Sequence, residues 1–376
     1  MLAGACPDSR GATGCEIISV EPRHYRVPLP EQLCDAGHGL HTHFELITCT
    51  LATSDGLEGT GYTYTGGRGG SAILSLIRDE LAPLLKGSSS TDIEALWNKQ
   101  RASLHYLGLG GITAFAVSAC DIALWDLRGK RTGASLIEMA GGKPEKVRCY
   151  RGLIDLGYSD EYLLQRVAEE FASGHTAVKL KVGREDIARD IARVKSVRAQ
   201  IGSEAYLMAD ANYSWTASQA IEFARGVEDC NLLWFEEPVS HVDLDAYAKV
   251  SKAIDTPLAS GENWRTIADF KAAIATAGLT FLQPDASNIG GITGWLKVAD
   301  LAQQHDMKIT CHGMHELHVS LMAGREGAAP MELHSFPIDA YTTNPTIVED
   351  GYVAPPTAPG TGVVFDDELL APHLIS

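Results

Sequence analysis

The first part of the chain alternates polar and apolar residues with the period of two that is typical of β-strands. This pattern covers residues 17–64 and is interrupted by a turn signal at Asp55-Gly56. Segments with helical character follow at 71–86 and 91–105. We therefore predict a small α+β domain over residues 15–135.

After this domain, short β-branched segments alternate with amphipathic helical segments, which indicates βα units and a parallel sheet. In the segment 186–200, for example, apolar residues recur at helical spacing. There are eight strand segments at a stride of roughly 25 residues, and eight is the number that closes a TIM barrel. We therefore predict an α/β barrel over residues 136–336. The strand segments are 147–153, 176–182, 205–212, 232–238, 256–262, 279–286, 307–313 and 331–336.

The two ends of the chain differ from these domains in composition. Residues 1–14 are small and polar, and we expect a disordered tail. The segment 337–376 is rich in proline and glycine, and we expect it to leave the barrel and pack back on the first domain.

The net charge of −17 argues against a nucleic-acid partner, because a phosphate backbone would be repelled. The 376 residues are 45% hydrophobic and 21% charged, an ordinary globular composition. No apolar run approaches the roughly 18 residues of a membrane span. The eight cysteines include no C-x-x-C pair, which indicates reduced thiols and a cytoplasmic location. These properties favour a soluble protein that acts on a small molecule.

One acidic residue lies at the end of each of three successive strand segments. Asp210 and Glu236 are 26 residues apart, and so are Glu236 and Glu262. Because the carboxyl ends of barrel strands meet at one face, we expect these carboxylates to converge. Three ionised carboxylates in one pocket need a cation, and an all-oxygen set favours Mg²⁺ over Zn²⁺. The alternative for any one of them is a surface loop charge.

Two lysines lie in a single strand segment, 176–182. Lys179 and Lys181 share one strand face, which we expect to be the barrel interior, where lysine can neutralise an anionic substrate or act as a general base. A solvated strand edge is the alternative.

His312 and Asp285 end two adjacent segments, so that the carboxylate can orient the imidazole. The alternative is a structural histidine of the core.

The segment HGMHELH offers a different metal hypothesis, in which His312, His315 and His318 form a soft-metal cluster. Their spacing of three residues fits neither one strand face nor the H-E-x-x-H helix pattern, so we disfavour this cluster. A serine hydrolase is also disfavoured, because the sequence contains no G-x-S-x-G motif.

Several short motifs occur in a fixed order along most of the chain. They are K-x-K at 179–181, D-A-N at 210–212, W-F-E-E-P at 234–238, G-E-N-W at 261–264, Q-P-D-A at 283–286, I-G-G-I-T-G-W at 289–295, the strand-end His312, and DIALWDLRGK at 121–130. In these motifs the chain resembles the enolase superfamily, and specifically its mandelate racemase subgroup. The resemblance implies a (β/α)₇β TIM-type barrel with an N-terminal α+β capping domain. It also implies a homo-oligomer.

The same resemblance implies that Lys181 removes the proton α to a carboxylate from one face, while the dyad of His312 and Asp285 acts on the other face. The acid that hydrogen-bonds the opposite carboxylate oxygen would be Glu332, although Glu316 is also nearby. The remaining implied residues are Lys179 near the substrate carboxylate, and Asp210, Glu236 and Glu262 as ligands of Mg²⁺.

The capping domain is expected to select the reaction that occurs after proton removal. Its polar residues are Asp35, His38, His41, His43 and Glu45 in the segment 31–45, and Tyr62, Tyr64 and Arg68 further along. A pocket for an aromatic hydroxy acid would instead present apolar groups. We therefore predict dehydration of an aldonate or aldarate sugar acid to a 2-keto-3-deoxy acid. The alternatives are a racemase, epimerase or cycloisomerase of a 2-hydroxy acid, and a non-catalytic barrel that binds sugar acids. The predicted substrate contacts are Asn212, Tyr62, His43 and Trp264.

Overall fold

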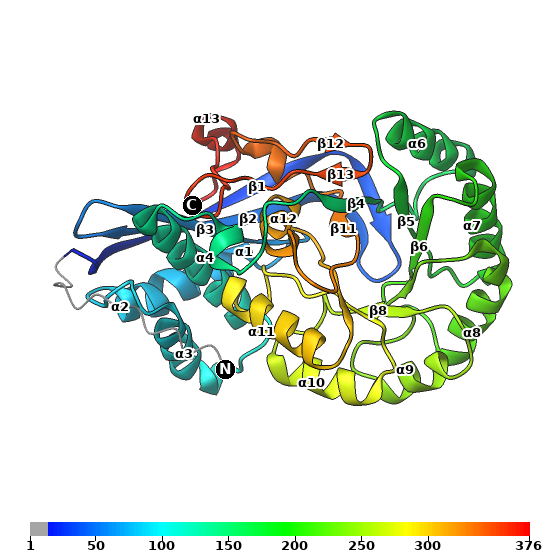
Figure 1. The fold of residues 1–376 in the computed structure, drawn as a ribbon, viewed down its shortest axis with the longest axis horizontal. Helices are drawn as coiled ribbons and strands as arrows, with labels where there is room; N and C mark the ends of the chain where they lie inside the picture. Colours follow the sequence, from blue (N-terminus) through cyan, green and yellow to red (C-terminus); the bar gives the residue numbers. More distant parts are fainter. Residues whose placement is uncertain (1–13) are drawn as a thin grey trace.

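A computed structural model describes residues 14–376 of the chain, so the tail expected over 1–14 lies outside the described residues except for Gly14. The capping domain begins with a three-stranded antiparallel sheet in the order β1-β2-β3. Helices cover this sheet on one side (Figure 1). The elements are β1 Ile17–Asp35, β2 Gly39–Thr53, β3 Glu58–Thr65, α1 Gly70–Leu76, a π-helical turn Ile77–Leu81, α2 Ala82–Leu85, α3 Ile93–Ser103, α4 Ile112–Thr132 and α5 Leu136–Met139.

The hairpin of β1 and β2 is longer than the sequence pattern suggests. A register shift between Pro28 and Leu33 lets β1 continue past two prolines as far as Asp35. The turn of this hairpin reaches the barrel, where the backbone N–H of Cys34 donates to the Ile154 carbonyl at 3.2 Å. The hairpin therefore carries cap side chains to the loops of the barrel.

Helix α4 packs against β3 through glycines. A Cβ atom on Gly61 would lie 2.1 Å from the Ala119 carbonyl oxygen, and one on Gly59 would lie 2.5 Å from that of Ala123. Glycine at these positions permits the close approach of helix and sheet.

The barrel confirms the predicted (β/α)₇β TIM-type architecture. Its strands run parallel in the order β10-β9-β8-β7-β6-β5-β4, with β11 beside β4, and a bridge between Ile309 and Ala328 brings β10 to the segment before β11. Helices α6 to α11 lie along the outer rim (Figure 1). The elements are β4 Val147–Gly152, α6 Asp160–Ala172, β5 Ala177–Lys181, α7 Ile187–Ile201, β6 Tyr206–Asp210, α8 Ala217–Gly226, β7 Phe235–Glu236, α9 Leu244–Ser251, β8 Leu258–Ser260, α10 Ile267–Thr276, β9 Phe281–Leu282, α11 Gly291–Gln304, β10 Lys308–Ile309, α12 His315–Met322 and β11 Met331–Leu333.

The inside of the barrel is a packed apolar layer beneath the polar strand ends. Tyr150, Met208 and Trp234 are fully buried there and belong to one cluster with Phe281. Because side chains two residues apart share a strand face, Met208 lies below Asp210 and Trp234 below Glu236. This layer forms the floor under the polar groups at the strand ends.

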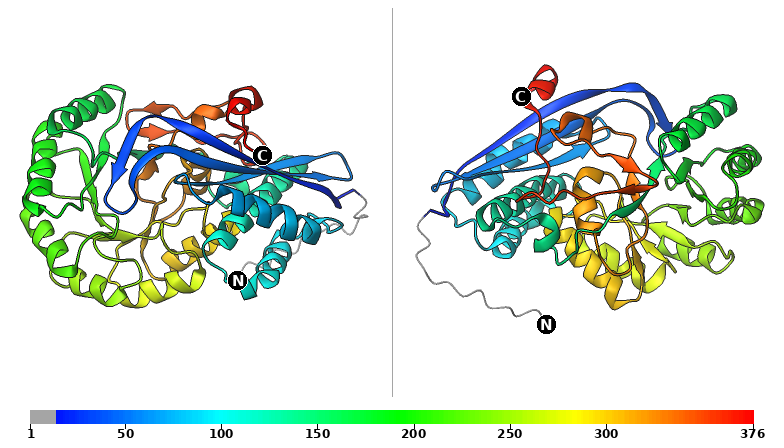
Figure 2. Two further views of the ribbon diagram at one scale, coloured as in Figure 1. Left: turned by 180° about the vertical axis from the view of Figure 1, so that it is seen from behind. Right: turned by 45° about the horizontal axis from the view of Figure 1, so that its top comes forward.

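The C-terminal segment contacts both domains (Figure 2). Strand β13 (Tyr352–Val353), paired with β12 (Val348–Glu349), lies antiparallel to β4. Further on, the Phe365 ring meets Tyr62 of the cap with ring centroids 5.0 Å apart, and the Ile375 N–H donates to the carbonyl of His24 in β1 at 2.8 Å. The segment includes the short helix α13 (Asp367–Leu370).

The seven cysteines within residues 14–376 are free thiols. Within the same residues, no helix combines the length and the apolar character needed to cross a membrane.

Candidate active site

The three carboxylates predicted as metal ligands meet at the carboxyl ends of β6, β7 and β8. One oxygen from each of Asp210, Glu236 and Glu262 lies within 4.8 Å of the others, and all three side chains are buried. Asp210 ends β6 and Glu236 ends β7, whereas Glu262 follows β8 by two residues. The one-acid-per-strand spacing of the sequence thus brings these groups to a single point.

The cluster has the properties of a divalent-cation site. Burial and the neighbouring carboxylates of Asp210 and Glu262 raise the pKa of Glu236 to about 7 against the attraction of Lys179, so the cluster is short of positive charge. Glu262 Oε2 is buried without a hydrogen-bond partner among the described residues. Gln283 Nε2 and Trp234 Nε1 donate to Glu236 Oε2 at 2.7 and 3.0 Å and fix its orientation. Three acidic oxygens at this separation fit a hard ion such as Mg²⁺.

Both lysines of β5 are buried beside these carboxylates. Lys181 Nζ donates to Asp210 Oδ2 at 2.5 Å. Lys179 Nζ is 2.6 Å from Glu236 Oε1 and 2.9 Å from Glu332 Oε1. Burial opposes the charge of Lys181, but the attraction of Asp210 outweighs it and raises the lysine pKa.

His312 and Asp285 form the predicted dyad in the loops that follow β10 and β9, each three residues beyond its strand. His312 Nδ1 is 2.9 Å from Asp285 Oδ2, and Tyr64 of the cap donates its hydroxyl proton to the same oxygen at 2.9 Å. His312 Nε2 lies 3.1 Å from Glu262 Oε2 without the angle of a hydrogen bond. Burial alone would lower the pKa of His312, but the carboxylates of Glu262 and Asp285 raise it to about 10.

Of the two candidate glutamates, Glu332 belongs to this group and Glu316 does not. Glu332 lies on β11 between Lys179 and the backbone N–H of Gly313, which donates to Oε2 at 3.0 Å. Glu316 is on α12, where the hydroxyl of Tyr62 donates to its Oε1 at 2.5 Å.

These groups open onto a cavity of about 410 Å³ between the barrel mouth and the cap. Lys181, Glu262 and His312 line it from the barrel. Its other lining residues include Asn212, Asn263, Arg265, Ser287, Asn288 and His334 from the barrel, Asp35, His38, His41, Tyr64, Thr65 and Arg68 from the cap, and the apolar Leu40, Phe115, Ile154 and Phe336.

On the cap side, Asp35 organises two histidines at the hairpin turn. Its carboxylate lies 2.8 Å from His41 Nε2 and 3.2 Å from His38 Nδ1. His38 Nε2 also lies 3.0 Å from the hydroxyl of Tyr213, which follows β6. The cap therefore presents fixed polar groups to the cavity.

Three of the four predicted substrate contacts lie outside the cavity lining, and Asn212 alone lies on it. His43 points elsewhere along β2, with Nε2 3.2 Å from the Gly67 carbonyl oxygen. Tyr62 is buried against Glu316, and the Trp264 indole N–H donates to the His241 carbonyl at 3.0 Å.

Several lining residues were not predicted from the sequence, among them His334, Arg265 and Asn288. A signal existed for His334, because it follows Glu332 by two residues and so shares its strand face. Arg265 and Asn288 lie in loops, where the sequence carries no such periodicity.

The alternative cluster of three histidines does not form. His315 Nε2 is 3.1 Å from Asp339 Oδ1, and His318 Nδ1 is 2.7 Å from the Gly313 carbonyl oxygen, whereas His312 faces the cavity. Each imidazole has its own partner.

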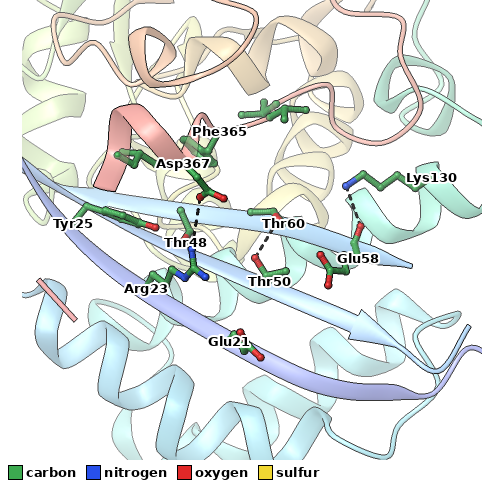
Figure 3. A pocket seen from close by; sticks show the side chains of 13 residues that line it. Glu21, Arg23, Tyr25, Thr48, Thr50, Glu58, Thr60, Lys130, Phe365 and Asp367 are labelled. Carbon is green, nitrogen blue, oxygen red and sulfur yellow. Dashed lines mark hydrogen bonds and ion pairs between the residues drawn. The ribbon is translucent and has the colours of Figure 1, made fainter. Parts of the chain in front are cut away.

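A second cavity, of about 280 Å³, lies between the cap sheet and the C-terminal segment (Figure 3). Both basic residues that line it have partners within the protein, because Arg23 is 3.6 Å from Asp367 and Lys130 donates to the Glu58 carbonyl at 3.0 Å. It contains no strand-end residue of the barrel. The cavity at the barrel mouth is therefore the candidate active site.

Comparison with known proteins agrees with this geometry. Residues 18–141 match the model of the mandelate racemase/muconate lactonizing enzyme N-terminal domain, and residues 163–369 match the enolase C-terminal domain-like family. A 3,6-anhydro-alpha-L-galactonate cycloisomerase of Streptomyces coelicolor is 42% identical, with 92% of this chain and 96% of that protein covered. An L-talarate/galactarate dehydratase of Salmonella typhimurium is 35% identical over 77% of this chain and 72% of its own length.

Among solved structures, that of a racemase from Streptomyces coelicolor with bound magnesium superimposes with a TM-score of 0.93 at 40% identity, covering 96% of this chain and 100% of the other. The resemblance inferred from the motifs is confirmed. The chain belongs to the mandelate racemase/muconate lactonizing enzyme family of the enolase superfamily.

Proposed function

We propose that this protein is a Mg²⁺-dependent lyase that dehydrates a polyhydroxylated sugar acid, an aldonate or aldarate, to a 2-keto-3-deoxy acid. One observation carries the proposal: Lys181 and His312 line the same cavity and contact different members of one carboxylate cluster. Lys181 lies beside Asp210, and His312 lies beside Glu262. A base and an acid can therefore act on one bound substrate. Mg²⁺ held by Asp210, Glu236 and Glu262 would supply Lewis-acid stabilisation of charge on the substrate carboxylate.

Lys181 is the proposed general base for the α-proton. Asp210 supplies the attraction that raises the lysine pKa, so sharing the charge of Asp210 with a cation lowers that pKa towards the value a base needs. Lys181 Nζ then takes the proton from the α-carbon, and the electron pair of the C–H bond is delocalised onto the substrate carboxylate as an enediolate. This pair forms the double bond between the α- and β-carbons when the β-oxygen leaves.

His312 is the proposed general acid for the departing β-oxygen. Asp285 is not part of the carboxylate cluster and holds the Nδ1–H of His312, which favours the imidazolium form. Nε2 can then give its proton to the β-hydroxyl as the carbon–oxygen bond breaks, and water leaves. The resulting enol tautomerises to the 2-keto-3-deoxy acid.

The lining of the cavity supports a polyhydroxylated substrate. The cap provides Asp35, His38 and His41, and the barrel provides Asn212 and Asn288, all of which can pair with hydroxyl groups. An aromatic acid would leave the side-chain oxygens of Asn212 and Asn288, which have no hydrogen-bond partner among the described residues, still unpaired, at a cost of about 1–3 kcal/mol for each.

A second candidate uses the same proton transfers on a cyclic substrate. The relative at 42% identity is a cycloisomerase of an anhydro sugar acid. If the β-oxygen is the ether oxygen of an anhydro ring, its departure opens the ring, and the product is an isomer of the substrate with one new hydroxyl.

The test is to incubate the protein and Mg²⁺ with diastereomeric aldonates, aldarates and 3,6-anhydrogalactonate, and to assay for keto acids with semicarbazide. We expect a keto acid, and its mass separates loss of water from isomerisation. Incorporation of deuterium at the α-carbon without any keto product would overturn elimination in favour of racemisation or epimerisation.

Two variants separate an enzyme from a binding protein. We expect Lys181→Met and His312→Asn each to reduce kcat/KM by at least about 10³-fold, whereas Lys195→Met on the surface should not. A sugar-acid-binding protein without catalysis would show no turnover in any of them.

A further inference from the structure

The hairpin of β1 and β2 carries a second group of metal-binding side chains at its turn. One donor atom each of Asp35, His38 and His41 lies within 4.8 Å of the other two. All three residues line the wall that the cap contributes to the cavity. They come from the capping domain alone, whereas the carboxylates at the strand ends come from the barrel. We call these three residues the cap cluster.

The donor atoms of the cap cluster are spaced as the ligands of one metal ion are. Asp35 Oδ2 lies 2.8 Å from His41 Nε2 and 3.2 Å from His38 Nδ1. Nitrogen and oxygen ligands lie about 2.0–2.2 Å from a bound Zn²⁺ ion, so two neighbouring ligand atoms are themselves about 3 Å apart. One cation can therefore replace the hydrogen bonds between this carboxylate and the two imidazoles without a large movement of the side chains.

The aromatic ring of Tyr213 holds His38 in place. His38 Nε2 lies 3.0 Å from the Tyr213 hydroxyl, and a Cβ atom on Gly37 would lie 2.7 Å from the same oxygen, so the turn packs closely against this ring. A partner that orients the ring through its other nitrogen is usual for a metal-binding histidine. When Nδ1 binds a cation, the proton of the neutral ring is on Nε2 and is donated to the Tyr213 oxygen.

The carboxylate of Asp35 has no permanently charged partner in the cap. It is 5% exposed, and within residues 14–376 its ion-pair partners are His38 and His41, with no lysine or arginine among them. Lys181 lines the same cavity, but its ammonium group is 2.5 Å from Asp210 Oδ2. A buried carboxylate beside neutral imidazoles is stabilised by a cation.

Two imidazoles and one carboxylate select a different cation from three carboxylates. Nitrogen ligands suit Zn²⁺ and other divalent transition metals, whereas Mg²⁺ prefers oxygen. A set of two histidines and one carboxylate also leaves coordination positions open for a further ligand. The open side of the cap cluster is the cavity, where the side-chain oxygen of Asn212 is buried without a hydrogen-bond partner among the described residues.

We propose that Asp35, His38 and His41 form a second metal site, which binds Zn²⁺ or a similar divalent transition metal while Mg²⁺ occupies the carboxylates at the strand ends. A cation in the cap cluster engages the groups that would otherwise pair with the hydroxyl groups of a sugar acid. Zn²⁺ is therefore an inhibitor that competes with the substrate. The metal site does not depend on the proposed function, but this competition rests on it.

Calorimetric titration with ZnCl₂ at saturating Mg²⁺ tests the site without any substrate. We expect one Zn²⁺ ion per chain, whose affinity falls at least about 100-fold in Asp35→Asn and in His41→Asn, because each variant lacks a ligand. Tyr213→Phe removes only the outer partner of His38 and should weaken binding about 10–100-fold. His43→Asn, in the same segment but outside the cavity, is the control and should bind Zn²⁺ as the unmodified protein does.

Zn²⁺ that binds only in place of Mg²⁺ at the strand ends would keep its affinity in all these variants, and that result would overturn the proposal. Nitrogen-15 NMR of the unmodified protein gives a readout that needs no variant to fold. Addition of Zn²⁺ at saturating Mg²⁺ should shift the signals of His38 Nδ1 and His41 Nε2. A shift confined to His312, or no shift of any histidine, would contradict the site.

Steady-state kinetics with a sugar acid that is turned over test the competition. At saturating Mg²⁺, Zn²⁺ should raise KM and leave kcat unchanged. The inhibition constant should increase in Tyr213→Phe by the same factor as the Kd for Zn²⁺. A fall in kcat at constant KM would overturn the competition. Absence of turnover would count against the proposed function only, since calorimetry and NMR report on the metal site by themselves.

Discussion

At the scale of single residues, the proposed role of His312 as an acid depends on its hydrogen bond to the carboxylate of Asp285. Asp285 accepts the Nδ1–H of His312 and is itself held by Tyr64 and by the Ser287 N–H, which donates to Oδ1 at 2.7 Å. Because this carboxylate fixes the tautomer and stabilises the imidazolium, we expect Asp285→Asn to reduce kcat/KM by about 10²–10⁴-fold. Loss of the negative charge should also lower the pKa of His312, so activity should fall at a lower pH on the alkaline side of the profile.

The matched control is Tyr64→Phe, which removes one donor to Asp285 and keeps the dyad. A loss of about tenfold or less is expected, with a smaller change in the pH profile. An alkaline limb that does not move in Asp285→Asn would show that the pKa of His312 has another origin.

The sequence predicted the site residues whose position follows from one rule, namely that the functional side chains of a TIM barrel lie at the carboxyl ends of its strands. Lys181, Asp210 and Glu236 are found where that rule places them, because each ends a strand. His43, in contrast, was chosen from a segment rich in histidine, and the register of β2 against β3, which pairs Glu45 with Thr65, places it beside Gly67 instead of in the cavity. A choice between His41 and His43 requires the pairing of two strands, which local sequence does not determine.

At the scale of elements, the capping domain is joined to the barrel where α4 meets the N-terminus of α11. Asp121 on α4 accepts from the backbone N–H of Thr293 at 2.9 Å and from its hydroxyl at 2.6 Å. Ser118 on the same helix accepts from the N–H groups of Gly290 and Gly291 at 3.0 and 2.9 Å. These side chains satisfy N–H groups that a helix N-terminus leaves free.

Removal of this contact should therefore weaken the protein. We expect Asp121→Ala to lower the free energy of unfolding by about 2–4 kcal/mol, because buried donors lose their partner. The measurement is urea unfolding at saturating Mg²⁺. Asp300→Ala, at an exposed position of α11, is the control and should change stability by less than about 0.5 kcal/mol. Equal effects of the two substitutions would rule out a structural role for the contact.

The same contact explains the two glycines of the I-G-G-I-T-G-W motif, whose role the sequence alone does not reveal. Gly290 and Gly291 both have positive φ, and a Cβ on Gly291 would lie 2.4 Å from Asp121 Oδ2. A Cβ on Gly290 would lie 2.9 Å from Trp97 Nε1 of α3, so the two glycines are needed because of two helices that lie far earlier in the chain. The length of β1 could not be predicted from local sequence either. This strand extends to Asp35 because β2 pairs with it.

At the scale of the whole molecule, two domains and a C-terminal segment enclose the carboxylate cluster. Without a bound cation, the negative charge of this cluster is not balanced by the protein. The folded state holds the pKa of Glu236 at about 7, above its ordinary value of 4.5. Between pH 4.5 and about pH 7, Glu236 is ionised in the unfolded chain but protonated in the folded protein. The contribution of Glu236 to metal-free stability is therefore fully present below about pH 4.5 and is lost as pH rises through about 7, with a size on the order of 3 kcal/mol.

Binding of Mg²⁺ should reverse this loss, because the cation needs ionised carboxylates and competes with the proton. We expect saturating Mg²⁺ to raise the melting temperature clearly at pH 8 and much less at pH 5, and a chelator to abolish both the shift and the activity. In Glu236→Gln the pH dependence of metal-free stability should shrink, while Glu326→Gln, at an exposed position, should behave as the unmodified protein does. If Mg²⁺ stabilised the protein equally at the two pH values, the carboxylate cluster would not be the group that exchanges protons for the metal.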